Sequence, residues 1–264
     1  MKKIAVINDI SGFGRCSLTA ALPVISSFGV QCCPLVTGVY SNQTGYDSYK
    51  SVDLTDSLPE FIKEWKKLGV HFDAIITGFV TSAKQGSIIS DFIDSFRNGA
   101  VVVVDPVMAD DGEVYNGFDD ARINAVKALA EKADIVTPNL HELCILAGES
   151  FSPDLDCNAV LSMSERLTAK TVITTGIKRE NEVITAVYSG GEFRTFSAKK
   201  MGHSFSGTGD ILASYVTAAL VSGDDVFTAA EKAVRFIEKA IELTLLENPE
   251  TPYRAEGVYF EKLL

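Results

Sequence analysis

The segment Gly207-Thr208-Gly209-Asp210 stands directly before an apolar run and combines two glycines, a hydroxyl and a carboxylate. Glycines let the backbone approach a ligand closely, and a helix that begins here would point unpaired N–H groups at an anion. A carboxylate beside such donors could take the proton from an acceptor hydroxyl during phosphoryl transfer. We interpret the segment as the catalytic centre of a small-molecule kinase with Asp210 as general base. Alone, it fits a capped helix start with a favourable first-turn acid equally well.

Two further acids follow predicted strands. Asp105 comes directly after the β-branched run 101–104, and Glu142 follows the predicted strand 135–137. Asn139 lies three residues before Glu142, so the two would share one face of a helix. Asn139 could simply cap that helix. Alternatively, Asp105 and Glu142 hold Mg²⁺ through water, because Mg²⁺ prefers oxygen ligands and usually keeps several waters.

Two loops expected at the same edge are also candidates. Residues 8–15 contain Gly12-x-Gly14, but the third glycine of a dinucleotide-binding fingerprint is missing and no acid closes the second strand. This loop is either a tight strand–helix turn or also a ligand contact. Residues 38–46 are polar and poor in charge, which fits a surface loop or a clamp for a neutral or aromatic substrate.

Motifs and charge argue against several classes of protein. The chain contains neither the G-x-x-x-x-G-K-[ST] P-loop nor the H-R-D and D-F-G motifs of protein kinases. A net charge of −11, without a run of Lys or Arg longer than two, argues against nucleic-acid and membrane-surface binding. Five cysteines without a C-x-x-C pair argue against a disulfide framework and a structural zinc site. No apolar stretch is long enough for a signal peptide or a membrane span, so we expect a cytoplasmic protein.

Short apolar runs alternate with longer helical segments along the chain. Predicted strands cover residues 3–7, 30–37, 74–77, 101–104, 135–137 and 171–174, and a hairpin joins 183–189 to 192–196. Predicted helices cover residues 15–28, 58–68, 84–96, 123–131, 140–147, 160–167, 210–220 and 226–246. This alternation predicts one α/β domain over residues 1–264, with a mostly parallel sheet covered by helices on both faces. Such sheets bind ligands beyond the carboxyl ends of their strands.

Five motifs resemble those of one family and follow one another along the chain in the same order as in that family. Gly207-Thr208-Gly209-Asp210 resembles the anion-hole and base motif of the ribokinase superfamily, and Ser41-Asn42-Gln43-Thr44-Gly45-Tyr46 is similar to the substrate loop of pyridoxal kinases. Gly78-Phe79, Asp105-Pro106-Val107-Met108 and Thr137-Pro138-Asn139-Leu140-x-Glu142-Leu143 resemble further motifs of the family. The resemblance covers essentially the whole chain and implies a ribokinase-like three-layer α/β/α fold, usually in a homodimer.

The resemblance also implies an activity, which is ATP-dependent phosphorylation of the 5′-hydroxymethyl group of a vitamin B6 vitamer. Asp210 would take the hydroxyl proton, and the backbone of Gly207, Thr208 and Gly209 would hold the charge of the γ-phosphate. Mg²⁺ is the expected metal, held by Asp105 and Glu142, with K⁺ as a further candidate cation. The residues expected on the nucleotide side are Asp105, Thr137, Asn139, Glu142, Thr174, Thr175, Lys199 and Lys200. The residues expected on the substrate side are Asp9, Ser11, Thr44, Gly45, Phe79 and Asp210.

Two positions depart from the pyridoxal kinase pattern. Asp9 stands where those enzymes place Ser, and Phe79 where they often place Tyr. The stretch Asp9-x-Ser11-Gly12 is instead similar to hydroxymethylpyrimidine kinases of thiamine synthesis, which are the alternative function. An acid at Asp9 could favour a cationic substituent such as the aminomethyl group of pyridoxamine. A sugar kinase is less well supported, because the first strands leave no room for an added β-lid, and an intact Asp210 argues against a non-catalytic sensor.

Overall fold

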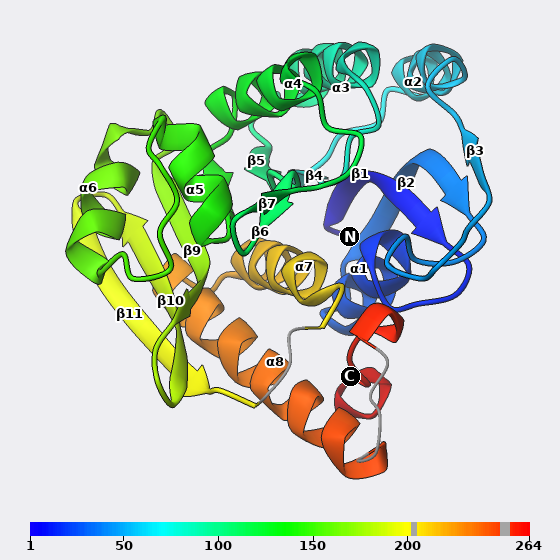
Figure 1. Ribbon diagram of the computed structural model, residues 1–264. Helices are drawn as coiled ribbons and strands as arrows, with labels where there is room; N and C mark the ends of the chain where they lie inside the picture. Colours follow the sequence, from blue (N-terminus) through cyan, green and yellow to red (C-terminus); the bar gives the residue numbers. More distant parts are fainter. Residues whose placement is uncertain (202–204, 249–253) are drawn as a thin grey trace.

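A central sheet of nine strands organises the described residues (Figure 1). A computed structural model of the chain describes residues 1–201, 205–248 and 254–264. The spatial order is β11-β10-β9-β8-β5-β4-β1-β2-β3, and the six neighbouring strands from β9 to β2 are parallel. The strands are β1 (Lys3–Ser11), β2 (Gln31–Tyr40), β3 (Ser51–Asp53), β4 (Ala74–Thr77), β5 (Val101–Val104), β8 (Ile135–Val136), β9 (Thr171–Lys178), β10 (Glu182–Ser189) and β11 (Glu192–Lys199).

Helices cover both faces of this sheet, so the described chain has three layers (Figure 1). One apolar core lies between the sheet and α2 (Leu58–Lys67), α3 (Ala83–Phe96), α4 (Asp120–Glu131), α5 (Leu140–Ala147) and α6 (Cys157–Arg166). A second core lies between the opposite face and α1 (Ser17–Ser27), α7 (Thr208–Ser222) and α8 (Val226–Glu247). Both faces are apolar because the central strands are rich in β-branched residues, as in the all-valine β5. The expected α/β/α architecture is confirmed.

The strands nearest the site are longer than the sequence predicts. β1 continues to Ser11 and β2 to Tyr40, so Asp9 and Ser11 lie within a strand rather than in the loop after it. Parallel pairing of β1 with β2 holds this polar end of β1, with a register shift between Asn8 and Ile10. The apolar run ends at Ile7, and hydrophobicity alone therefore stops the prediction too early.

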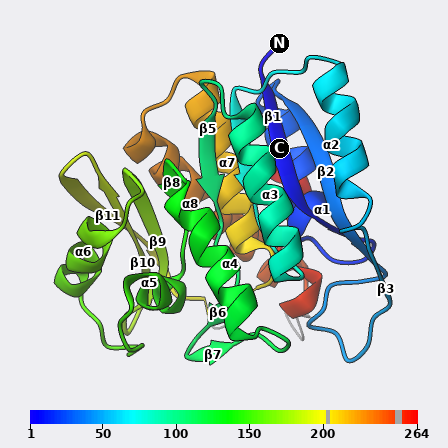
Figure 2. The same ribbon diagram turned by 90° about the horizontal axis from the view of Figure 1, so that it is seen from above.

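Three short strands and several helix bounds also differ from the prediction. β3 and the hairpin formed by β6 (Ala109–Asp110) and β7 (Glu113–Val114) were not predicted, because two or three residues are too few for an apolar pattern. α1 begins at Ser17 and α7 at Thr208, and the other predicted helices agree within a few residues. The six parallel strands run towards the edge that Figure 1 faces, as the view from above shows (Figure 2). Within the described residues, no helix is both long and apolar enough to cross a membrane.

Phe92 of α3 offers a test of the first core. It is fully buried, and its ring lies 4.5 Å from that of Phe96 and 6.0 Å from that of Trp65, centroid to centroid. Because a large cavity would remain, we expect Phe92→Ala to lower the free energy of unfolding by about 3–5 kcal/mol in urea titrations. Phe61→Ala on α2 is the matched control, since Phe61 is 44% exposed, and should cost below about 1 kcal/mol. Equal losses for the two variants would contradict this assignment of the core.

Candidate active site

Asp210 lies in the first turn of α7, next to a helix start that only glycine can build. Gly207 caps the helix with a φ of 82°, and a Cβ there would lie 1.9 Å from the carbonyl oxygen of Arg15. The first hydrogen bond of the helix runs from Ile211 N–H to Gly207 O, 2.9 Å long, so the N–H groups before Ile211 lack intrahelical acceptors. The Thr208 hydroxyl donates back to Phe205 O. An anion here would therefore meet peptide N–H groups and the positive end of α7.

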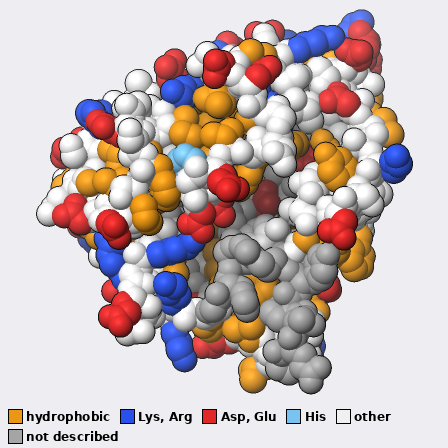
Figure 3. Space-filling model, in the orientation of Figure 1, with side chains coloured by type: hydrophobic (Ala, Val, Ile, Leu, Met, Phe, Trp, Pro, Cys, Tyr) orange, Lys and Arg blue, Asp and Glu red, His pale blue; other side chains and the backbone are white. Residues whose placement is uncertain are grey.

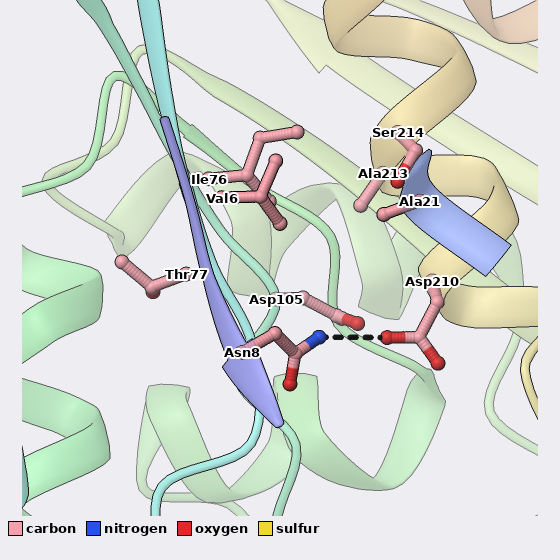
Figure 4. A pocket seen from close by; sticks show the side chains of 10 residues that line it. Val6, Asn8, Ala21, Ile76, Thr77, Asp105, Asp210, Ala213 and Ser214 are labelled. Carbon is pink, nitrogen blue, oxygen red and sulfur yellow. Dashed lines mark hydrogen bonds between the residues drawn. The ribbon is translucent and has the colours of Figure 1, made fainter. Parts of the chain in front are cut away.

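The Asp210 carboxylate meets two N–H donors from the other side of the site. Asn8 Nδ2 donates to Asp210 Oδ1 over 3.0 Å (Figure 4). The backbone N–H of Ser17 faces the same carboxylate and lowers its pKa. Burial raises the pKa of Asp210 to about 6, the charge of Asp9 adds to the rise, and the two donors oppose it. A carboxylate with a pKa near 6 is a stronger base than a free aspartate and still ionised at neutral pH.

Asp105 and Glu142 extend this acidic site across the sheet edge. Asp105 follows β5, is 7% exposed and accepts a 3.1 Å hydrogen bond from the Thr137 hydroxyl. Burial raises its pKa, and the negative charge of Asp210 raises it further. Glu142 is 4% exposed, and burial together with the charge of Asp105 holds its pKa well above the usual range. Three carboxylates therefore lie together, where each disfavours ionisation of its neighbour.

Asp105 and Asp210 line a small cavity between β1, β4 and α7. Its volume is about 10 Å³, at the lower limit for one water molecule. Asn8, Thr77, Asp105 and Asp210 form its polar side, and Figure 4 shows the side chains of Asn8 and Asp105 extending towards Asp210. Figure 3 shows that the molecular surface is hollowed in the middle of this face, with acidic side chains in and beside the hollow.

The donor set fits a hydrated Mg²⁺ ion. Asp105 and Glu142 supply carboxylate oxygens, and a bound cation would relieve the repulsion that raises both pKa values. Within the described residues, no cluster of three or more His, Cys, Asp or Glu side chains is arranged to hold a metal ion. Few protein ligands are typical of Mg²⁺, which keeps several waters and binds phosphate oxygens as well.

Asn139 caps α5, and this is one of the two interpretations that the sequence allowed for these residues. Its side-chain oxygen accepts from Glu142 N–H, and Glu142 Oε2 accepts from Asn139 N–H, both over 2.9 Å. Asn139 Nδ2 donates to Ala109 O of the β6–β7 hairpin. Glu142 Oε1 accepts from Met108 N–H over 3.0 Å. The capping box thus fixes the position of the Glu142 carboxylate beside Asp105.

The other residues expected on the nucleotide side lie along the same edge. Thr174 and Thr175 end the parallel part of β9, where Thr175 N–H donates to Pro138 O, and the buried Thr174 hydroxyl has no partner among the described residues. Lys199 ends β11, four strands away from β5, and Lys200 follows it. The Lys199 backbone N–H donates to Glu238, and Lys200 Nζ donates to Arg179 O. These lysines are therefore not brought together with the three carboxylates.

The residues expected on the substrate side fall into two groups. Asp9 is 5% exposed and accepts from Ser17 Oγ over 2.8 Å and from Ser11 Oγ over 3.4 Å, so Ser11 supports Asp9. Phe79 N–H donates to Asn8 Oδ1, which connects the loop after β4 to the same site. Thr44 and Gly45 instead lie exposed on the loop after β2, where Gly45 N–H donates to the Gln43 side chain.

Sequence reasoning gave no role to Asn8 or Ser17, and it named Gly78 only as part of the Gly78-Phe79 motif. Asn8 stands between the apolar run of β1 and Asp9, which was a usable signal. A Cβ at Gly78 would lie 2.5 Å from Asn8 Nδ2, so this glycine gives the Asn8 side chain its space. Ser17 carried no sequence signal, because its role depends on a backbone conformation that serine rarely adopts.

The chain belongs to the phosphomethylpyrimidine kinase family, whose sequence model matches residues 14–251. A chloroplastic thiamine biosynthetic bifunctional enzyme of Arabidopsis thaliana is 28% identical over 247 residues, which cover 90% of this chain. The chain spans about half of that relative, 46% of its length. The pyridoxal kinase PdxY of Leifsonia xyli is 26% identical over 258 residues, with 92% of this chain and 89% of the relative covered.

Solved structures agree with this assignment. A Bacteroides thetaiotaomicron protein assigned as a phosphomethylpyrimidine kinase is 37% identical and superposes with a TM-score of 0.93, covering 99% of this chain and 92% of that one. Another crystal form of that protein was solved with pyridoxal and gives a TM-score of 0.92, with 99% and 94% covered. The pyridoxal kinase of Lactobacillus plantarum is 26% identical with a TM-score of 0.91, covering all of this chain and 95% of that one. The expected ribokinase-like fold is confirmed.

Repulsion within the site predicts that removing one buried charge stabilises the protein. Because the pKa of Asp105 is raised in the folded state, folding is favoured where Asp105 is protonated, below its ordinary pKa of about 4. That contribution is lost as the pH rises above this value. We expect Asp105→Asn to raise the Tm by about 2–6 °C at pH 8 and by much less at pH 4.5, measured by calorimetry.

Asp91→Asn is the control for this experiment, because Asp91 is exposed on α3. It should leave the Tm unchanged at both pH values within about 1 °C. A lower Tm of Asp105→Asn at pH 8 would contradict the proposed repulsion.

Proposed function

We propose that this protein is an ATP-dependent kinase that phosphorylates the 5′-hydroxymethyl group of a vitamin B6 vitamer. Pyridoxal, pyridoxine or pyridoxamine would give its 5′-phosphate, and ATP would give ADP. The observation that carries the proposal is the partly exposed Asp210 at the anion-binding start of α7, beside the buried acids Asp105 and Glu142. The pyridoxal kinases among the similar proteins, and pyridoxal in the structure of a 37% identical protein, support this substrate class.

The geometry supports a direct transfer. Asp210 would accept the proton of the 5′-hydroxymethyl group as its oxygen forms a bond to the γ-phosphorus, and the bond from this phosphorus to the bridging oxygen of ADP would break. The backbone N–H groups of Gly207, Thr208 and Gly209 would stabilise the charge on the transferred group. Asn8 and the Ser17 N–H would orient Asp210.

On the nucleotide side, Asp105 and Glu142 would hold Mg²⁺ through its waters, with Thr137 and Asn139 orienting the two acids. Bound Mg²⁺ would neutralise charge on the phosphates during transfer. We retain Thr174, Thr175, Lys199 and Lys200 as candidate nucleotide contacts, and K⁺ as a second cation to be varied in assays. We also propose that residues 1–264 act as one kinase domain, within a cytoplasmic homodimer.

On the substrate side, Asp9, supported by Ser11, would face a basic group or N–H of the substrate ring. Phe79 would pack near the ring, and Thr44 and Gly45 would approach it from the loop after β2. An ionised Asp9 would attract a cationic aminomethyl group more strongly than a hydroxymethyl or aldehyde group. Pyridoxamine should therefore have the highest kcat/KM of the three vitamers.

A second candidate function is hydroxymethylpyrimidine or phosphomethylpyrimidine kinase. The matching family and the Asp9-x-Ser11-Gly12 stretch favour it, and so does the thiamine biosynthetic relative. A coupled ADP-release assay with the three vitamers and hydroxymethylpyrimidine separates the two functions. We expect turnover of the vitamers with pyridoxamine ahead, and faster turnover of the pyrimidine would instead favour the second function. Equal turnover of the three vitamers would contradict the proposed preference of Asp9.

Asp210→Asn tests the base. The amide keeps the size of the side chain but cannot take the hydroxyl proton at neutral pH, so kcat should fall by about 10²-fold or more. ATP affinity, measured by isothermal titration, should stay within about threefold, because the N–H groups at the start of α7 remain. Asp91→Asn, on the exposed face of α3, should keep full activity. A kcat of Asp210→Asn near that of the unsubstituted protein would remove Asp210 from this role.

A further inference from the structure

We propose that Ser17 is a positioning residue that links the substrate-facing acid Asp9 to the base Asp210. This inference rests on the proposed function, because it concerns how the two ends of one small substrate are held. Ser17 is the first residue of α1 and is 8% exposed, so it is buried. Its role would be to fix Asp9 and Asp210 relative to each other without touching the reacting atoms.

The backbone of Ser17 is in a conformation that serine rarely adopts. Its φ is 48°, and the described residues contain one other non-glycine residue with positive φ, Asp111 at 49°. This left-handed region costs a residue with a Cβ free energy that glycine would avoid. Backbone strain of this kind persists where the surrounding structure over-determines it, and it is often found at functional sites.

Both polar groups of Ser17 are directed at acids of the site. The hydroxyl Oγ donates to Asp9 Oδ1 over 2.8 Å. The backbone N–H faces the Asp210 carboxylate and lowers its pKa. Ser17 therefore faces two carboxylates that belong to different elements, β1 and α7.

Asn8 closes the connection on the opposite side. Asn8 Nδ2 donates to Asp210 Oδ1, and Asn8 Oδ1 accepts from the Asp9 backbone N–H, both over 3.0 Å. Three hydrogen bonds thus connect Asp210 to Asn8, Asn8 to Asp9 and Asp9 to Ser17. A shift of Asp9 or Asp210 relative to these partners would break at least one of the three bonds.

The Ser17 hydroxyl donates a hydrogen bond to the Asp9 carboxylate, which glycine at this position could not do. Asp9 is buried, and burial favours its protonated form, whereas a donated hydrogen bond from Ser17 favours the carboxylate. An ionised and oriented Asp9 is needed to accept a hydrogen bond from a protonated ring nitrogen or an aminomethyl group. Loss of the hydroxyl should therefore weaken substrate binding, while the nucleotide side of the site keeps its contacts.

Two variants test the role of Ser17 in the full-length protein. Ser17→Ala removes the hydroxyl and keeps the strained backbone, and Ser17→Gly removes the hydroxyl and relieves the strain. We expect both to lower kcat/KM for pyridoxal and pyridoxamine by about tenfold or more, mainly through KM. The KM for ATP should stay within about twofold. The matched control is Ser27→Ala in the last turn of α1, where an exposed hydroxyl donates to Val24 O, and it should leave all constants unchanged.

The Ser17→Gly variant separates a positioning role from a merely structural one. If Ser17 served only to shape the start of α1, glycine would be equal or better there, and Ser17→Gly would keep full activity and a Tm at or above that of the unsubstituted protein. That result, with the unsubstituted protein active on the vitamers, would overturn the role of Ser17 alone. No vitamer turnover by the unsubstituted protein would overturn both the proposed function and this inference.

Discussion

Two buried carboxylates, Asp105 and Glu142, and the partly exposed carboxylate of Asp210 constrain the rest of this structure. Asp105 and Glu142 are almost fully removed from solvent, and Asp210 lies next to Asp105 at the start of α7. Each of the three has a raised pKa, because burial and a neighbouring negative charge both disfavour its ionised form. Such an arrangement costs stability in the protein alone and becomes favourable when cations and phosphates bind. The acids are therefore better explained by the ligand they receive than by any contribution to folding.

The parallel sheet is what allows these side chains to meet. Asn8 lies in β1, Asp105 directly follows β5, and Glu142 lies in α5, the helix that follows β8. These parallel strands end along one edge of the sheet, where β4 lies between β1 and β5. The start of α7 reaches the same edge from the helical layer, and Gly207 permits this because no Cβ would fit against Arg15 O. Local hydrogen bonds then orient the side chains. The capping box between Asn139 and Glu142, for example, turns the Glu142 carboxylate towards Asp105. Burial of apolar strands on both faces thus provides the rigidity that the polar edge requires.

The sequence predicted the parts of the site that depend on strand order and on helix starts. Asp105 and Asp210 could be named because one ends an apolar β-branched run and the other follows a glycine pair before an apolar run. Asn8 also follows an apolar run, but its role was missed because it depends on a hydrogen bond to Asp210, which is distant in sequence. Ser17 was missed for a different reason, since its backbone has a φ of 48°, which serine rarely adopts and which no sequence pattern indicates. The small hairpin β6–β7, which accepts a hydrogen bond from Asn139, is likewise fixed by tertiary contacts.

Phosphorus NMR of the reaction itself tests the central claim most directly, because it identifies the atom that receives the phosphoryl group. The protein would be incubated with pyridoxamine, ATP and Mg²⁺, and the phosphorus signals followed over time. We expect the γ-phosphate signal of ATP to be replaced, mole for mole, by a phosphate monoester on the 5′-hydroxymethyl oxygen together with ADP. Release of inorganic phosphate without a monoester, or no change with any of the three vitamers, would contradict the account.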